Sequence, residues 1–274
     1  MSIVDPEVLL LLASGVAGGF VAGLLGVGGG VVYVAIFTSY LKGKLPVELW
    51  GDALVKYTIA NAVFSLTFAG LTASLSHMAK RTFYLAPVLL LGIGGCIGAV
   101  GTTMLLSSVN YSSKAFAVVF SILLLPIIAR MIFSKDSLLP ESESRNALFP
   151  TGVIAGVVMA VSGLGGGVVM VPVLASLFKM PIKKAISISL GALALTGLGL
   201  SVFNIFISHL PEMGIGVNLG PVILPMVLPV VVGVLVGSPL GVAASRKLHS
   251  RVLRILFVAA CLAVMTKLFI EFVI

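Results

Sequence analysis

The chain has 274 residues, of which 59% are hydrophobic and only 9% charged, and its mean hydropathy is +1.23. A soluble domain of this size could not bury so much apolar surface, so the composition excludes a soluble globular protein and predicts one embedded in lipid. The net charge of +8 comes from Lys and Arg in short runs between apolar segments. That pattern is typical of membrane topology signals and argues against nucleic acid as a partner.

Eight apolar segments follow one another along the chain. They cover residues 8 to 40, 49 to 75, 83 to 109, 114 to 133, 148 to 178, 183 to 208, 217 to 244 and 251 to 273. A spanning helix needs about 20 apolar residues, so the segments predict an all-α polytopic membrane protein. The most polar stretch, 134–147, separates two sets of four. We therefore expect transmembrane repeats over 1–133 and 148–274, joined by a polar linker.

An internal duplication relates these two halves. Residues 15–37 align without gaps on residues 152–174, with 11 identities in 23 positions. Self-similarity of this kind indicates a repeated structural unit. The shared core is a GxGGGVV motif, with Gly26, Gly28, Gly29 and Gly30 in the first half and Gly163, Gly165, Gly166 and Gly167 in the second.

The first segment of each half has an unusual length. As one straight helix it would be about 50 Å long, which is too long for a hydrocarbon core of about 30 Å and too short for two complete spans. Because glycine weakens a helix, we expect each segment to break at its glycine motif. The break would give a re-entrant segment or a hairpin, and two short complete spans remain an alternative.

Charge counting bears on the topology. If the first and fifth segments are hairpins that enter and leave on one side, one membrane face collects 12 Lys and Arg and the other collects 4. If all eight segments span, the division is 10 and 6. The positive-inside rule therefore favours hairpins, with both termini outside the cell. The resulting fold has two inverted repeats, each a glycine-broken helix followed by three spanning helices.

The glycine motifs allow two interpretations. Broken helices expose backbone N–H groups and positive dipole ends near the midplane, where together they can hold an anion. Alternatively, the glycines only let helices pack closely, which is our interpretation of the GxxxG spacings Gly94/Gly98 and Gly233/Gly237. The duplication and the unusual segment length favour an anion site for the GxGGG motifs.

On this hypothesis the substrate-binding residues are the eight motif glycines together with Ser162. Four polar side chains at the starts of the second segments, Thr58, Asn61, Ser187 and Ser189, would line the site. Serine and threonine in membrane helices often bond only their own backbone, so a local role remains open for them.

Few ionisable residues fall inside the apolar segments. Asp52 and Lys56 are four positions apart, so they form either a helix-surface pair or a charge site for the substrate. His77 and His209 stand at matching segment ends and are interfacial or proton-responsive. No Cys/His cluster is present and enzyme signature motifs are absent, so we expect no metal, no cofactor and no catalysis.

The motif sequences GLLGVGGGVVYVAIF and SGLGGGVVMVPVL, each opening one half of the chain, resemble those of the TauE/SafE family of sulfite exporters and related anion permeases. The resemblance covers the whole chain. It implies a secondary transporter of the cytoplasmic (inner) membrane that moves sulfite, sulfoacetate or another organosulfonate by alternating access. The family's usual proline after the motif is present at Pro172, whereas Ala35 replaces it in the first half, so the two hairpins need not be equivalent.

The resemblance leaves several points open. The motif does not specify which small anion is the substrate, whether it is imported or exported, whether protons are coupled, or the oligomeric state. An anion channel or a non-transporting membrane scaffold, in which the glycines only pack helices, remains the alternative. The lipid bilayer is the expected surrounding in each case.

Overall fold

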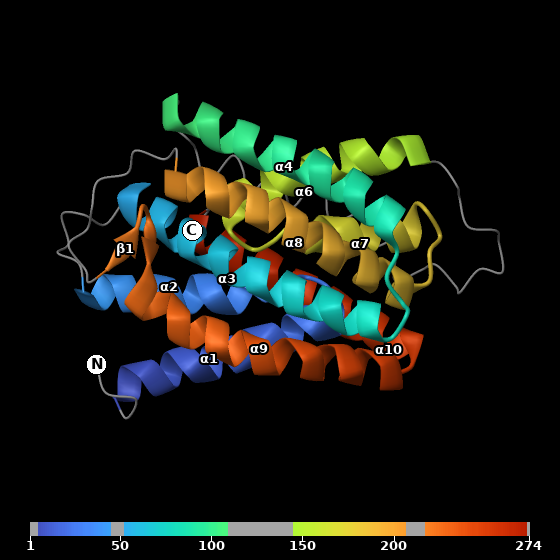
Figure 1. Cartoon of the computed structure of the whole chain (residues 1–274), viewed down its shortest axis with the longest axis horizontal. Helices are drawn as coiled ribbons and strands as arrows, with labels where there is room; N and C mark the ends of the chain where they lie inside the picture. Colours follow the sequence, from blue (N-terminus) through green and yellow to red (C-terminus); the bar gives the residue numbers. More distant parts are fainter. Residues whose placement is uncertain (1–4, 45–51, 109–144, 207–216, 273–274) are drawn as a thin grey trace.

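The computed structural model of the chain describes residues 5–44, 52–108, 145–206 and 217–272 (Figure 1). The helices in order are α1 (Pro6–Leu25), α2 (Gly30–Lys44), α3 (Asp52–Ala79), α4 (Leu85–Ser108), the short 3-10 helix η2 (Arg145–Ala147), α6 (Leu148–Ser162), α7 (Gly167–Ser176), α8 (Ile182–Phe206), α9 (Leu224–Lys247) and α10 (Ser250–Phe272). Two short strands, β1 (Asn218–Leu219) and β2 (Val222–Ile223), pair antiparallel. The apolar segment 114–133 and most of the linker lie outside the described residues.

Five of the described helices, α1, α3, α4, α8 and α9, are long and apolar enough to cross a membrane. The expectation of an all-α polytopic membrane protein is therefore confirmed for the described residues, apart from the one small β-hairpin. Large apolar side chains such as Leu75 and Leu105 are exposed, whereas polar ones such as Asn61 and Ser238 are buried. This distribution suits a lipid environment, where polar groups must find their partners inside the protein.

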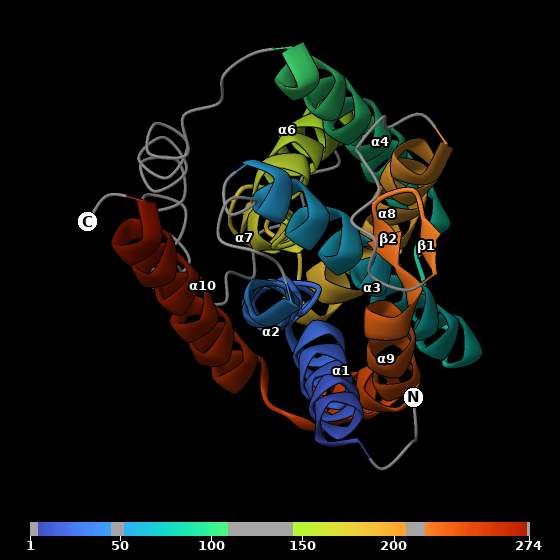
Figure 2. The same ribbon diagram turned by 90° about the vertical axis from the view of Figure 1, so that its left-hand side faces the viewer.

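The helices pack in matched pairs. Helix α1 runs along α9, and α6 runs along α4 (Figure 2). Glycines make both contacts close, as the GxxxG spacings predict, because Gly94 faces the carbonyl of Phe149 and Gly233 faces that of Leu12. A side chain at either glycine would collide with the main chain of the neighbouring helix.

Helices α3 and α8 form the remaining central pair. Gly70 faces the main chain of Ala194, and Gly197 faces the hydroxyl of Thr67, so the two helices run antiparallel. The Thr67 and Ser201 hydroxyls lie 3.3 Å apart across the contact. The α1–α9, α4–α6 and α3–α8 pairs each join a helix from the part of the chain before the linker to one from the part after it.

Candidate functional site

Both glycine motifs break a helix, as the segment lengths predict. Helix α1 ends before Gly26, whose φ is 74°, and Gly28 follows at 99° before α2 begins. The second break repeats these two left-handed positions, with φ of 64° at Gly163 and 94° at Gly165, but it differs at the third glycine, where φ is 70° at Gly29 and −65° at Gly166. Residues with a Cβ rarely adopt left-handed angles, so glycine is required at the four shared positions.

After the first break, the chain turns back along α1. Gly29 and Tyr33 both lie against Gly18, and the Lys44 ammonium at the end of α2 is 2.9 Å from the Glu7 carboxylate at the start of α1. Helices α1 and α2 therefore form a hairpin whose two ends lie together. Its arms are unequal, since 20 residues give about 30 Å and 15 give about 22 Å of helix.

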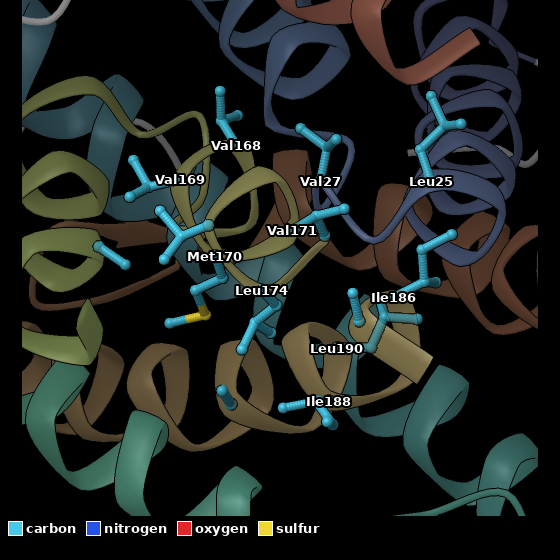
Figure 3. Close-up of a cluster of buried hydrophobic side chains, with 14 of the residues drawn as sticks. Leu25, Val27, Val168, Val169, Met170, Val171, Leu174, Ile186, Ile188 and Leu190 are labelled. Atoms are coloured by element: carbon cyan, nitrogen blue, oxygen red, sulfur yellow. The ribbon is translucent and has the colours of Figure 1, made fainter. Parts of the chain in front are cut away.

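The two breaks lie against each other at the centre of the bundle. Gly30 faces the carbonyl of Leu164, and a Cβ built on Gly165 would lie 2.7 Å from the carbonyl oxygen of Val27. The side chains of Leu66 and Leu193, from the middles of α3 and α8, flank Gly28 and Gly165. Figure 3 shows Val27 of the first break beside Val168 and Val171 of α7. We call this region the crossing.

Backbone N–H groups at the crossing lack acceptors. The first hydrogen bonds of α2 run from the N–H groups of Val32 and Tyr33 to the Gly29 carbonyl, at 3.0 and 3.3 Å. Helix α7 repeats this pattern at Gly166. In the described part of the chain, no acceptor meets the N–H groups of Gly30, Val31, Gly167 and Val168.

The crossing glycines are buried, and a buried N–H group without an acceptor is unfavourable. Each helix also begins with the positive end of its dipole at the crossing. An anion placed between the two helix starts would satisfy both the N–H groups and the dipoles. The same glycines also allow the two breaks to approach, so both interpretations of the motif fit the geometry.

Two of the predicted serines contact the breaks. The Ser189 hydroxyl donates to the Gly26 carbonyl at 2.9 Å. Ser162 donates to the Val158 carbonyl at 2.6 Å and accepts from the Leu164 N–H at 3.2 Å, so it caps the end of α6.

Thr58 is 3% exposed, and its hydroxyl has no hydrogen-bond partner among the residues that the structure describes. The next residue, Ile59, lies against the second break, with its Cα 3.3 Å from a Cβ built on Gly163. Thr58 is therefore a buried polar group on the part of α3 that approaches the crossing.

Asn61 and Ser187 hold connecting segments of the protein's own main chain. Asn61 Nδ2 donates to the carbonyl oxygens of Tyr57 and Pro221, at 2.7 and 2.9 Å, and its Oδ1 accepts from the Ile223 N–H at 2.8 Å. Ser187 donates to the Thr82 carbonyl at 2.6 Å. Both polar groups are thus engaged within the fold.

The structure describes only some of the ionisable candidate side chains. Lys56 is exposed on α3, while the side chain of Asp52 lies outside what the structure describes. His77 is buried with its Nδ1 2.9 Å from the Thr82 hydroxyl, and His209 falls in a segment outside the described ranges. The described residues contain no group of three or more His, Cys, Asp or Glu that could hold a metal ion.

Tyr33 is a candidate that the sequence reasoning missed. It is fully buried against Gly18, one helical turn after Gly30, and its hydroxyl has no partner in the described chain. The corresponding residue of the second half is Met170. The sequence could have indicated Tyr33, because the two aligned motifs carry a phenol in one half and a thioether in the other. A residue that only packs in both halves does not need a hydroxyl.

The fold and the crossing together define a multi-pass helical membrane protein with two related halves. The description of the matching family is sulfite exporter TauE/SafE, and the match covers residues 11–268. The chain therefore belongs to the TauE/SafE sulfite exporter family.

Three curated relatives carry similar names. A probable membrane transporter protein of Methanocaldococcus jannaschii is 27% identical over 91% of this chain and 92% of its own length. Another, of Haemophilus influenzae, is 27% identical over 96% and 98%. The probable membrane transporter protein YunE of Bacillus subtilis is 27% identical over 73% and 79%. No solved structure gives a significant match.

Proposed function

We propose that the protein is a secondary transporter that moves a small sulfur-containing anion, such as sulfite, sulfoacetate or another organosulfonate, across the cytoplasmic membrane by alternating access. The family and the relatives' names support a membrane transporter. The choice of a sulfur-containing anion rests on the family description.

The observation that carries the anion site is the set of N–H groups at the crossing that have no acceptor among the described residues. Each helix start contributes about half a positive charge, so two facing starts supply about one charge. That charge suits one singly charged group, such as hydrogensulfite or a sulfonate, which the Gly30 and Gly167 N–H groups would bind from opposite sides. Tyr33 and Thr58 are buried hydroxyls that could complete the shell around the anion.

The distribution of basic residues supports an orientation in the membrane. One end of the bundle joins the end of α3, the start of α8 and the end of α9, because Ser187 reaches Thr82 and the Lys183 ammonium donates to the Arg246 carbonyl at 2.8 Å. This end carries Lys80, Arg81, Lys183, Lys184, Arg246, Lys247, Arg251 and Arg254. We place it in the cytoplasm by the positive-inside rule, with the Glu7–Lys44 end of the first hairpin outside.

The antiparallel arrangement of α3 and α8 supports inverted repeats, as expected for a carrier whose site lies between its two halves. In that arrangement the two hairpins enter the membrane from opposite sides and meet at its centre. Alternating access would then expose the crossing to one side at a time.

The test is flux in proteoliposomes against sulfite, sulfoacetate, taurine, sulfate and simple carboxylates, each with and without a pH gradient. We expect saturable, counterflow-capable movement of a sulfur-containing anion, and the gradient shows whether protons are coupled. Flux that does not saturate or show counterflow would indicate a channel. Silence across the panel from folded protein would contradict the proposed substrate class and favour a scaffold.

A further inference from the structure

Two connecting segments close opposite ends of the bundle. The first, which we call the strand loop, is residues 217–223 and contains β1 and β2. Val222 and Ile223 of this loop are fully buried. Asn61 of α3 holds the loop on both sides, since it donates to the Pro221 carbonyl at 2.9 Å and accepts from the Ile223 N–H at 2.8 Å.

The second segment, which we call the basic loop, is residues 80–84 between α3 and α4. Ser187 of α8 donates to the Thr82 carbonyl of this loop at 2.6 Å, and the Thr82 hydroxyl also bonds His77 Nδ1. The loop inserts an apolar side chain as well. Phe83 Cε2 would lie 3.0 Å from a Cβ built on Gly191.

The two anchoring side chains lie at similar depths on opposite sides of the crossing. Asn61 is five positions before Leu66 on α3, which corresponds to about 7.5 Å along the helix. Ser187 is six positions before Leu193 on α8, or about 9 Å. Because α3 and α8 run antiparallel and the two leucines flank the crossing, one anchor lies toward each membrane face.

We infer that the strand loop and the basic loop are the two gates of the transporter, latched by Asn61 and Ser187 respectively. The hydrogen bonds of both latches are formed in this structure. Breaking one latch opens the crossing to one side only, while the other loop stays in place. The inference rests on the proposed carrier function for its purpose, but its test uses no substrate.

The latches differ in strength. Asn61 makes two hydrogen bonds to the strand loop, whereas Ser187 makes one to the basic loop. Loss of buried hydrogen bonds shifts an open–closed equilibrium toward the open form. We therefore expect the larger effect from the Asn61 latch.

Side-specific cysteine labelling tests the inference. In a background with Cys96→Ala and Cys261→Ala, a reporter is placed at Ile59, which faces Gly163, or at Ile186, which faces Gly26. A membrane-impermeant maleimide is then added to one side of oriented proteoliposomes. The change in labelling rate reports the access of each reporter from that side.

We expect Asn61→Leu to raise labelling of the Ile59 reporter about tenfold from the strand-loop side and to leave the Ile186 reporter unchanged. Ser187→Ala should raise labelling of the Ile186 reporter from the basic side alone, by a smaller factor. Ser65→Ala is the matched control for Asn61, because the Ser65 hydroxyl donates to the Asn61 carbonyl within α3 and, among the described residues, has no hydrogen bond to either loop.

If either variant raises the labelling rate of both reporters, the bundle is loosened as a whole and the inference is overturned. It is also overturned if the labelling rates do not change in folded protein. If Asn61→Leu fails to fold, Val222→Ala and Phe83→Ala loosen the same two loops without changing the latches, and must give the same sidedness. A silent flux panel with side-specific labelling would refute the substrate class and leave the gates standing. Flux of a sulfur-containing anion without side-specific labelling would support the substrate class and refute the gates.

Discussion

The two glycine breaks share the left-handed turn that ends the first helix, but they differ in backbone at Gly29 (φ 70°) and Gly166 (φ −65°) and in their polar surroundings. Gly26 and Gly163 both adopt left-handed angles after the first helix of their hairpin, and each break packs its glycines against the main chain of the other. At the first break, α8 supplies the Ser189 hydroxyl to the Gly26 carbonyl, and Tyr33 adds a buried phenol. At the second, Ser162 caps its own helix.

This difference separates two roles of a duplicated motif. The glycines maintain a close approach that both halves need, so they recur in both copies. The side chains around them are free to diverge, and there the polar atoms of a substrate site can accumulate. We therefore expect side chains added at the glycine positions to impair folding, and substitution of the asymmetric Tyr33 to impair transport without a loss of stability.

The largest effect should come from Gly167→Ala, since a Cβ there would collide with the Gly26 carbonyl. Main chain cannot yield as a flexible side chain can, so we expect destabilisation of about 3 kcal/mol or more. Gly101→Ala is the matched control, because no atom of the described residues lies within 4 Å of its Cβ position. Thermal unfolding of purified protein in detergent measures both, and equal stability of the two variants would contradict the packed crossing.

Ser189→Ala should come next. It leaves the buried Gly26 carbonyl without its hydroxyl donor, which costs about 1 to 3 kcal/mol. Ser176→Ala removes a buried hydroxyl that donates to the Pro172 carbonyl of its own helix, and we expect a smaller loss. The same thermal measurement compares them, and a harmless Ser189→Ala would remove one of the distinctions between the breaks.

Tyr33→Phe should separate folding from transport. It removes a buried hydroxyl without a partner in the described chain, so stability should stay level or rise by about 1 kcal/mol. If the phenol contacts the anion, uptake falls about tenfold, the size expected for one lost hydrogen bond of about 1.4 kcal/mol. Tyr40→Phe, in the more open part of α2, should change neither. Unchanged flux in Tyr33→Phe would exclude Tyr33 from the site.

The smallest effect compares Ser201 with Ser74, which lie four positions after Gly197 and Gly70, the glycines at which α8 and α3 contact each other. The Ser201 hydroxyl lies 3.3 Å from the Thr67 hydroxyl, three positions before Gly70. The residue three positions before Gly197 is Ala194, which has no hydroxyl, and the Ser74 hydroxyl has no hydrogen-bond partner among the described residues. Ser201→Ala should therefore cost about 1 kcal/mol and Ser74→Ala nothing. A larger loss from Ser74→Ala would contradict this difference between the two positions.

Much of the fold could be predicted from the sequence, because apolar length and glycine spacing are local signals. The positions of both breaks and the packing role of Gly94 and Gly233 follow from such signals. The small β-hairpin at 218–223 could not be predicted from such signals, since two-residue strands carry no periodic pattern.

The candidate site was harder to predict. Ser189 and Ser187 are two positions apart and looked equivalent, yet one reaches the first break and the other a distant loop. Asn61 likewise turned out to hold a loop. Which partner a buried hydroxyl or amide meets depends on tertiary packing, which no spacing along one helix specifies. Tyr33 was overlooked because an aromatic residue in an apolar segment ordinarily indicates packing.

The central claim is that the backbone N–H groups of the two helix starts hold the anion. It is tested most directly by NMR of selectively labelled protein titrated with sulfite and with a simple organosulfonate. The account predicts that the amide protons of Gly30, Val31, Gly167 and Val168 shift together, with one dissociation constant that agrees with half-saturation of flux, while those of Gly94 and Gly98 stay fixed. Flux that saturates without any shift at these four amides would contradict it.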